Sequence, residues 1–256
     1  MNRYVTISAD DGHPTDLRTA DLLDKYGLAA TFYIPANNPE RPVMDAAQIR
    51  EISERFEVGG HTLNHMPLRA LPPAKAWSEI NEGKTWLENA LGRAVVSFCY
   101  PFGKFDVRTA ALVKQAGFIG ARTCLLNLCE FPRNPFFWGV STHAGPHSKY
   151  IQLRHALLEQ NFAGARNFFQ TYKGSTDWQQ HFLYALDHVE SNGGIAHLYL
   201  HSWEIAGAGD WGKLESIFKS IRKRNSLMSV TNGALFGRRC VPSLLAQGAE
   251  QIEPAS

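Results

Sequence analysis

Short apolar runs alternate with amphipathic stretches along most of this chain, and this alternation is the feature that most constrains its fold. Runs with the character of buried strands are residues 4–9, 30–35, 95–100, 195–200 and 227–230. Stretches with helical periodicity are residues 17–26, 46–56, 73–91, 106–116 and 212–224. Strands that alternate with helices predict an α/β fold with a parallel sheet, either open or closed into a barrel.

The length of 256 residues suits one large domain, which we expect to span residues 1–241. Residues 125–189 are rich in aromatic side chains and show no clear strand-helix repeat, so we expect them to form loops and helices that cover the site. The end of the chain, residues 242–256, is expected to be a flexible tail.

The charge and hydropathy patterns exclude two classes of protein. A net charge of +2, with no basic cluster longer than residues 222–224, gives no electrostatic support for nucleic-acid binding. No apolar run approaches the length that spans a bilayer, and the N-terminus shows no signal-peptide pattern. The expectation is therefore a cytoplasmic protein without a membrane span.

Residues that can carry chemistry follow several of the predicted strands. They are Asp10-Asp11-Gly12, His61, Pro101-Phe102 and His201. Active sites of parallel barrels lie at the C-terminal ends of the strands, so we expect these side chains to meet there. The agreement of four separate segments carries more weight than any one of them.

Two of these segments have the composition of a metal site. One Asp of the pair and the two histidines of His61-Thr62-Leu63-Asn64-His65 can hold a divalent ion and leave coordination positions open for water and substrate. The spare Asp can then take a proton from that water. Taken alone, Asp-Asp-Gly is as well explained by a turn, and the histidine pair is as often structural as functional.

The order of these motifs resembles the polysaccharide deacetylases, the NodB-homology proteins of carbohydrate esterase family four. The resemblance rests on Asp-Asp-Gly, His-Thr-x-x-His, Tyr-Pro-Phe-Gly and a late apolar strand that ends in His201, and it covers roughly residues 5–230. It implies a distorted (β/α) barrel and the metal-assisted removal of an acyl group from a sugar. It also implies that Asp11, His61 and His65 bind the metal.

The resemblance assigns catalytic roles as well. Asp10 matches the general base, His201 matches the general acid, and the backbone N–H of Phe102 matches the donor to the oxyanion. The arginine that steadies the base in the family is replaced here by Cys99. We expect Arg122, at the end of the next strand, to reach inward and hold Asp10 instead.

The expected substrate is an N-acylated sugar, linked to a nucleotide or a lipid, in the assembly of a surface polysaccharide or glycan. Candidates for sugar contacts are Trp138, Trp203, Trp211 and Glu204, the last of which also lies close enough in sequence to pair with His201. His143 is given no role and is expected to be a neutral surface or rim residue.

Several alternatives stay open. The acyl group is expected to be acetyl, but a sugar deformylase or a hydrolase of small cyclic amides would use the same fold. A non-catalytic carbohydrate-binding protein is less favoured, because a decayed site has no chemical reason to keep Asp10. Two imidazoles and one carboxylate favour Zn²⁺, although Co²⁺, Mn²⁺ or Ni²⁺ would fit the same ligands. The sequence does not define the oligomeric state.

Overall fold

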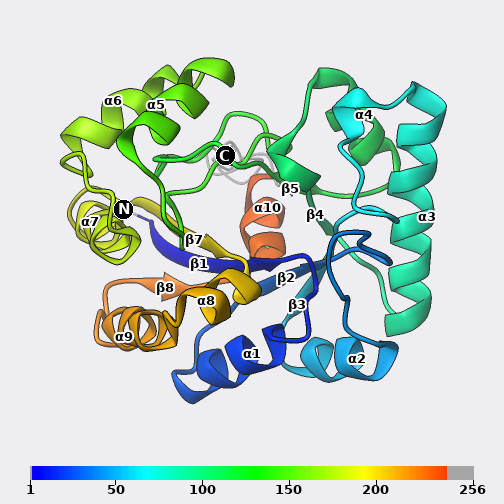
Figure 1. Cartoon of the computed structure of the whole chain (residues 1–256), viewed down its shortest axis with the longest axis horizontal. Helices are drawn as coiled ribbons and strands as arrows, with labels where there is room; N and C mark the ends of the chain where they lie inside the picture. Colours follow the sequence, from blue (N-terminus) through cyan, green and yellow to red (C-terminus); the bar gives the residue numbers. More distant parts are fainter. Residues whose placement is uncertain (1, 241–256) are drawn as a thin grey trace, which may run out of the picture.

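The computed structural model describes residues 2–240, and the tail predicted at residues 242–256 lies outside them. Within the described range, eight strands form one sheet in the order β5-β4-β3-β2-β1-β7-β6, with β8 beside β1 (Figure 1). The strands are β1 (Arg3–Asp10), β2 (Thr31–Ile34), β3 (Glu57–Gly60), β4 (Ser97–Cys99), β5 (Gly120–Arg122), β6 (Thr142–His143), β7 (Gly194–Leu200) and β8 (Met228–Ser229). Their pairings are parallel, as predicted.

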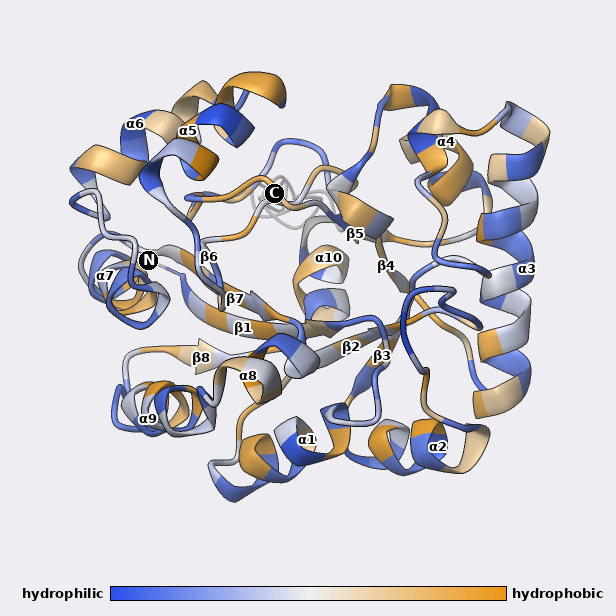
Figure 2. Ribbon diagram, in the orientation of Figure 1, coloured by the Kyte–Doolittle hydropathy of each residue, from blue (hydrophilic) through white to orange (hydrophobic). Residues whose placement is uncertain are grey.

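The helices lie mainly around the outside of this sheet, and orange and blue bands alternate along them in Figure 2, as expected for amphipathic helices. They are α1 (Asp16–Lys25), α2 (Ala46–Arg55), α3 (Pro73–Leu91), α4 (Val107–Gln115), α5 (Lys149–Leu158), α6 (Phe162–Gln170), α7 (Trp178–Asn192), α8 (Ser202–Ala208), α9 (Trp211–Arg222) and α10 (Asn232–Cys240). Two short 3₁₀ helices are η1 (Leu68–Ala70) and η2 (Pro101–Gly103). No helix of residues 2–240 is long and apolar enough to cross a membrane.

The sheet is curled, and one segment of the chain contacts the strands at both of its ends, β5 and β7. Strand β1 pairs with β7 along one edge from Arg3 to Ala9, while β2 and β8 pair with the end and the start of its other edge. At the far side, Trp138 forms a bridge to Arg122 of β5, and residues 142–143, only four positions later, form β6 beside β7. The segment 138–143 thus spans the gap between the edges, and the predicted distorted (β/α) barrel is confirmed.

Alternation along β1 separates an apolar layer from a polar one. Val5, Ile7 and Ala9 belong to the main hydrophobic core. The residues between them are also buried, but they form hydrogen bonds across the inside of the barrel: Thr6 Oγ1 donates to Asn232 Oδ1, and Ser8 Oγ lies 2.9 Å from His197 Nε2. Because successive strand residues point to opposite faces, the barrel is polar inside around Thr6 and Ser8 and apolar on the outer surface under the helices.

Helix α10 closes the end of the barrel where the strands begin (Figure 1). Its first residues bind the strand starts, since Asn232 N–H donates to Thr31 Oγ1 and Gly233 N–H donates to the Glu57 carboxylate. Phe236 is fully buried against Trp138, with ring centres 5.0 Å apart. The opposite end, where the strands finish, is therefore the end that is left for a site.

Residues 125–189 contain a strand that the sequence did not predict, the two-residue β6, together with α5, α6 and α7. Helix α7 packs against β6 and β7. This segment therefore supplies part of the barrel wall and its outer layer, in addition to loops near the site.

The loop that follows β3 is held by α3. Leu63 N–H donates to the Glu79 carbonyl, and Asn64 N–H donates to the buried Glu79 carboxylate at 2.8 Å. The helix approaches closely at Gly83, where a Cβ atom would lie 2.5 Å from the Thr62 carbonyl carbon. A side chain at this position would push on the loop that carries both candidate histidines.

We therefore expect Gly83→Ala to lower the free energy of unfolding by about 1–3 kcal/mol, through overpacking, as measured by urea denaturation. Gly207→Ala on α8 is the matched control, because a Cβ atom there would meet nothing within 4 Å. The control should gain a few tenths of a kcal/mol or stay unchanged, since alanine favours the helix. Equal stability of Gly83→Ala and the native protein would contradict the close approach.

Candidate active site

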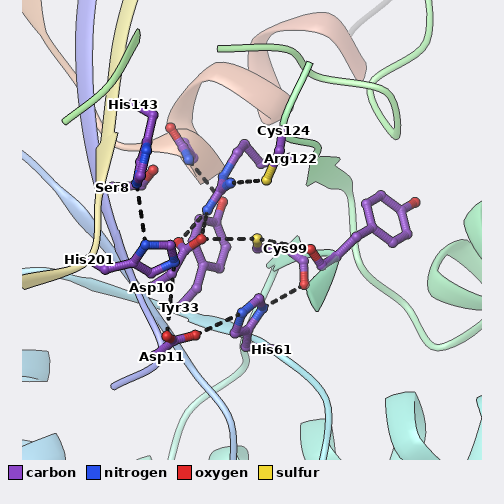
Figure 3. Close-up of polar contacts among 12 residues, drawn as sticks. Ser8, Asp10, Asp11, Tyr33, His61, Cys99, Arg122, Cys124, His143 and His201 are labelled. Carbon is purple, nitrogen blue, oxygen red and sulfur yellow. Dashed lines mark hydrogen bonds and ion pairs between the residues drawn. The ribbon is translucent and has the colours of Figure 1, made fainter. Parts of the chain in front are cut away.

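Asp10 is the last residue of β1, and the chain turns sharply directly after it. Asp11 and Gly12 both have positive φ angles, of 77° and 62°. A Cβ atom on Gly12 would lie 2.7 Å from Ile34 Cγ2, so the position requires glycine for space as well as for conformation. The turn sends the two carboxylates to different sets of partners (Figure 3).

Asp11 faces the two histidines. His61 and His65 lie on a loop, not on a helix, and Thr62 and His65 have positive φ angles of 69° and 52°. Their Nε2 atoms lie 3.7 Å and 3.1 Å from Asp11 Oδ1. His61 Nδ1 lies 2.8 Å from the Cys99 carbonyl oxygen, which can only accept a hydrogen bond. Nδ1 therefore carries the proton, and Nε2 presents a lone pair towards Asp11.

These three groups fit a divalent metal ion by the chemistry of their atoms. Asp11 Oδ1 is buried and makes no well-formed hydrogen bond, although two imidazole nitrogens face it. Burial lowers the pKa of His61 despite the neighbouring Asp11, which keeps the imidazole neutral. Burial alone would raise the pKa of Asp11, but the close approach of the two histidines outweighs this effect and lowers that pKa, so the carboxyl is ionised. A carboxylate and two imidazoles are ligands that zinc and similar ions prefer.

Asp10 faces Arg122 across the inside of the barrel. Arg122 is fully buried, and its Nη2 donates to the Asp10 carboxylate. Burial raises the pKa of Asp10, but the guanidinium charge outweighs it and holds that pKa below its ordinary value. The thiol of Cys99, whose pKa is raised by burial, stays protonated and lies 3.7 Å from Asp10 Oδ2. In register, Cys99 and Arg122 are paired on β4 and β5, so an arginine missing from one strand is supplied by the next.

Phe102 lies in the turn η2, with a positive φ of 57°. Its ring packs on His65, with ring centres 4.6 Å apart, and the side chain is half exposed at the mouth of the site. The hydrogen bonds of this turn run from Gly103 N–H to Tyr100 and from Lys104 N–H to Pro101, and they do not use the Phe102 N–H.

His201 follows β7 and is held by Glu204. His201 Nδ1 lies 3.0 Å from Glu204 Oε2, and its Nε2 lies 3.9 Å from Asp11 Oδ2. Burial opposes protonation of His201, but the hydrogen bond to Glu204 and the charges of Asp11 and Asp10 raise its pKa above the ordinary value. A proton on Nδ1 bonds Glu204, which leaves Nε2 directed towards the site.

His143 belongs to the same cluster, so its placement at the surface or rim was wrong, although burial lowers its pKa and keeps it neutral as expected. It is buried on β6, its Nε2 lies 2.9 Å from Glu204 Oε2, and its ring stacks on Tyr199 at 4.3 Å. Glu204 thus accepts from His143 and His201 with one oxygen. The sequence signal was weak: residues 140–142 include two β-branched side chains ahead of Gly145-Pro146, a run too short to predict a strand that ends at His143.

The three tryptophans proposed to stack on a sugar have different positions. Trp138 is buried between Phe131 and Phe236 at the start of the barrel, so its prediction as a substrate contact was wrong. Trp211 packs under Arg18 and is absent from the lining of the pocket described below. Trp203 does line that pocket, but Arg41 already lies on its ring and its indole N–H donates to Asp11 Oδ2 at 3.1 Å.

The site opens into a pocket of about 320 Å³. Its lining residues are Asp10, Asp11, Glu40, Arg41, His61, His65, Phe102, Cys124, His155, Tyr199, His201, Trp203 and Glu204. Side chains from β1, the loop after β3, η2 and the end of β7 therefore share one cavity, at the end of the barrel where the strands finish.

Comparison with known proteins supports the same family. Residues 2–121, which carry Asp10, Asp11, both loop histidines and Phe102, match the family described as polysaccharide deacetylase. The predicted resemblance to the polysaccharide deacetylases is confirmed. Arg122, His143, His201 and Glu204 lie after the matched residues, so their place in the site rests on the geometry alone.

Individual relatives agree with this result. The chain is 27% identical over 152 residues to a peptidoglycan N-acetylglucosamine deacetylase from Bacillus cereus, a match that covers 57% of this chain and 68% of the relative. An acetyl xylan esterase of family 4 from Clostridium thermocellum, solved with a cobalt ion, has a TM-score of 0.60 at 18% identity and covers 94% of this chain and 93% of its own. A family 4 carbohydrate esterase from Streptomyces lividans, solved with acetate, has a TM-score of 0.54 at 14% identity and covers 89% and 92%. The two structures are similar to this chain in fold.

The ion pair at the centre of the barrel gives a stability prediction. Arg122→Met leaves the Asp10 carboxylate buried without a counter-charge, so the free energy of unfolding should fall by about 3–5 kcal/mol in metal-free buffer. The double variant Asp10→Asn, Arg122→Met removes both charges and should be less destabilised than Arg122→Met alone. Urea denaturation of the native protein, both single variants and the double variant measures the coupling. Additive losses would show that the two side chains do not interact.

Proposed function

We propose that this protein is a metal-dependent hydrolase that removes an N-acyl group, with acetyl favoured, from a sugar. The observation that carries the proposal is that the adjacent carboxylates of Asp10 and Asp11 face different partners. Asp11 faces two imidazoles, while Asp10 is ionised, paired with Arg122 and directed into the same pocket. The activity named for the Bacillus cereus relative supports a sugar N-acetyl group as the target.

The proposed metal site consists of Asp11, His61 and His65. A divalent ion held by these residues would supply a positive charge that polarises the acyl carbonyl and lowers the pKa of a water molecule. Zn²⁺ is the proposed ion because of the two imidazole ligands. The cobalt ion in the Clostridium thermocellum structure supports a transition metal with a similar preference for imidazole ligands. The Cys99 carbonyl holds the His61 ring in the orientation and tautomer that binding requires.

Asp10 is proposed as the general base. Its lowered pKa means that it is ionised at neutral pH, and Arg122 fixes its orientation so that it can accept a proton from the attacking water. As the carbonyl carbon becomes tetrahedral, negative charge develops on its oxygen. The Phe102 N–H, which the turn hydrogen bonds leave unused, is proposed to donate to that oxygen.

His201 is proposed as the general acid that protonates the leaving amine. Its raised pKa keeps a useful fraction protonated near neutral pH, and Glu204 holds Nδ1 so that the Nε2 proton faces the pocket. His143 bonds the same Glu204 oxygen and stacks on Tyr199, so it fixes the position of the carboxylate. The proposed substrate is an N-acylated sugar linked to a nucleotide or lipid in glycan assembly.

The test of the function is acid release, followed by NMR, from a panel of N-acylated sugars with Zn²⁺ supplied. Asp10→Asn should lose turnover by at least about 10²-fold while it keeps bound metal, because it removes only the base. His61→Ala should lose both turnover and metal, measured by elemental analysis. His188→Ala on α7, which does not line the pocket, is the control. Near-native turnover by Asp10→Asn would contradict the assignment of Asp10 as the base. Release of formate instead of acetate would identify the acyl group as formyl.

Glu204 gives a prediction about pH. Its charge raises the pKa of His201, so the protonated acid is present at lower pH and is lost as the pH rises through that raised pKa. Glu204→Gln removes the charge, so the alkaline limb of the kcat/KM profile should move to lower pH. Glu54→Gln, at an exposed position of α2, should leave the limb in place. A limb that does not move in Glu204→Gln would mean that His201 is not the titrating acid.

A further inference from the structure

Arg41 is the one lysine or arginine side chain among the described residues that lines the pocket. Its guanidinium carbon lies 3.3 Å from the centre of the Trp203 ring. The indole N–H of Trp203 in turn donates to Asp11 Oδ2 at 3.1 Å. Through these two contacts, the indole ring of Trp203 links the permanent positive charge of Arg41 to Asp11 of the proposed metal site.

The other carboxylates of this pocket, apart from Glu40, already have partners. Asp10 pairs with Arg122, and Glu204 binds His143 and His201. Burial lowers the pKa of His155, which leaves this lining histidine neutral. Among residues 2–240, no carboxylate forms an ion pair with Arg41, although the exposed Glu40 is its neighbour in sequence and lines the same pocket.

The stacked arrangement leaves the useful part of the guanidinium free. Stacking occupies a face of the planar group, whereas its five N–H donors point outward in the plane. A guanidinium held in this way is suited to bind the two oxygens of a carboxylate or phosphate in a bidentate manner. The pocket is lined by four carboxyl groups, which would repel an anion if no cation lay beside it. Arg41 offsets this repulsion for an anionic substrate, whereas a neutral sugar would not need it.

We propose that Arg41, supported by Trp203, forms a subsite for an anionic group, a phosphate or a carboxylate, on the sugar substrate. This inference rests on the proposed function and adds one requirement to its substrate, a negatively charged group beside the acylated ring that the protein binds directly. A phosphate is present in sugars linked to a nucleotide or a lipid carrier, whereas a carboxylate is present in acidic sugars.

The simpler role for Arg41 is to hold Trp203 in place. Arg41→Met separates the two roles, because methionine keeps apolar contact with the indole ring and loses both the charge and the N–H donors. Arg41→Lys keeps the charge without the bidentate geometry. Arg50→Met is the matched control, since Arg50 is exposed on α2 and does not line the pocket.

The experiment compares N-acetylglucosamine with N-acetylglucosamine 1-phosphate and N-acetylmuramic acid as substrates of the metal-loaded protein. We expect kcat/KM for one of the charged sugars to exceed that for the neutral sugar by about tenfold or more, as for a hydrogen bond between charged groups. Arg41→Met should bring this ratio close to one through KM, Arg41→Lys should keep part of it, and Arg50→Met should keep all of it. Preference for the phosphate or for the carboxylate identifies the source of the anion.

Binding of the same three sugars, measured by saturation-transfer NMR and calorimetry, does not depend on turnover. If no sugar is hydrolysed but a charged sugar binds more tightly than the neutral one and loses this advantage in Arg41→Met, the proposed function fails and the subsite stands. If the protein hydrolyses or binds neutral and charged sugars equally, or if Arg41→Met keeps the preference, the subsite is overturned. A clamp for Trp203 would lower kcat/KM for all three sugars by the same factor, which also overturns it.

Discussion

The buried ion pair between Arg122 and Asp10 lies inside the barrel at the end of β1, and the rest of the site depends on it. Asp10 and Asp11 are adjacent in the chain, so both can be ionised only if each has its own cationic or hydrogen-bonding partners. Arg122 stabilises the first charge and the two loop histidines face the second. Environments that separate two neighbouring carboxyl groups in this way also separate their chemical roles.

Part of this arrangement could be predicted from the sequence. The strand ends at Asp10 and His201 followed from apolar runs that stop at polar residues, and the ends of parallel strands meet at one edge. The contact between Arg122 and Asp10 was predictable only as a compensation for Cys99. Comparison with the family motif shows that an arginine is missing at position 99. Only the register between β4 and β5 shows that Arg122 lies beside Cys99.

Other parts had no sufficient signal in the sequence. His143 belongs to a two-residue strand, which is too short for a period-two pattern, and its importance comes from contacts with Glu204 and Tyr199 that lie more than fifty positions away. Trp138 shows the opposite error. Its large ring suggested a sugar platform, but the bridge to Arg122 places it at the seam of the barrel, where an aromatic side chain fills the core.

The polar interior also explains why the site can be rigid. Inward groups of neighbouring strands bond one another, as Ser8 does with His197, and α10 binds the start of β2. Such groups contribute little net stability, because their bonds replace bonds to water. The apolar layer between the sheet and the outer helices must therefore supply most of the stability. Site residues on the inside can differ in charge and size, as Cys99 and Arg122 do, because each of them reaches a polar partner across the barrel.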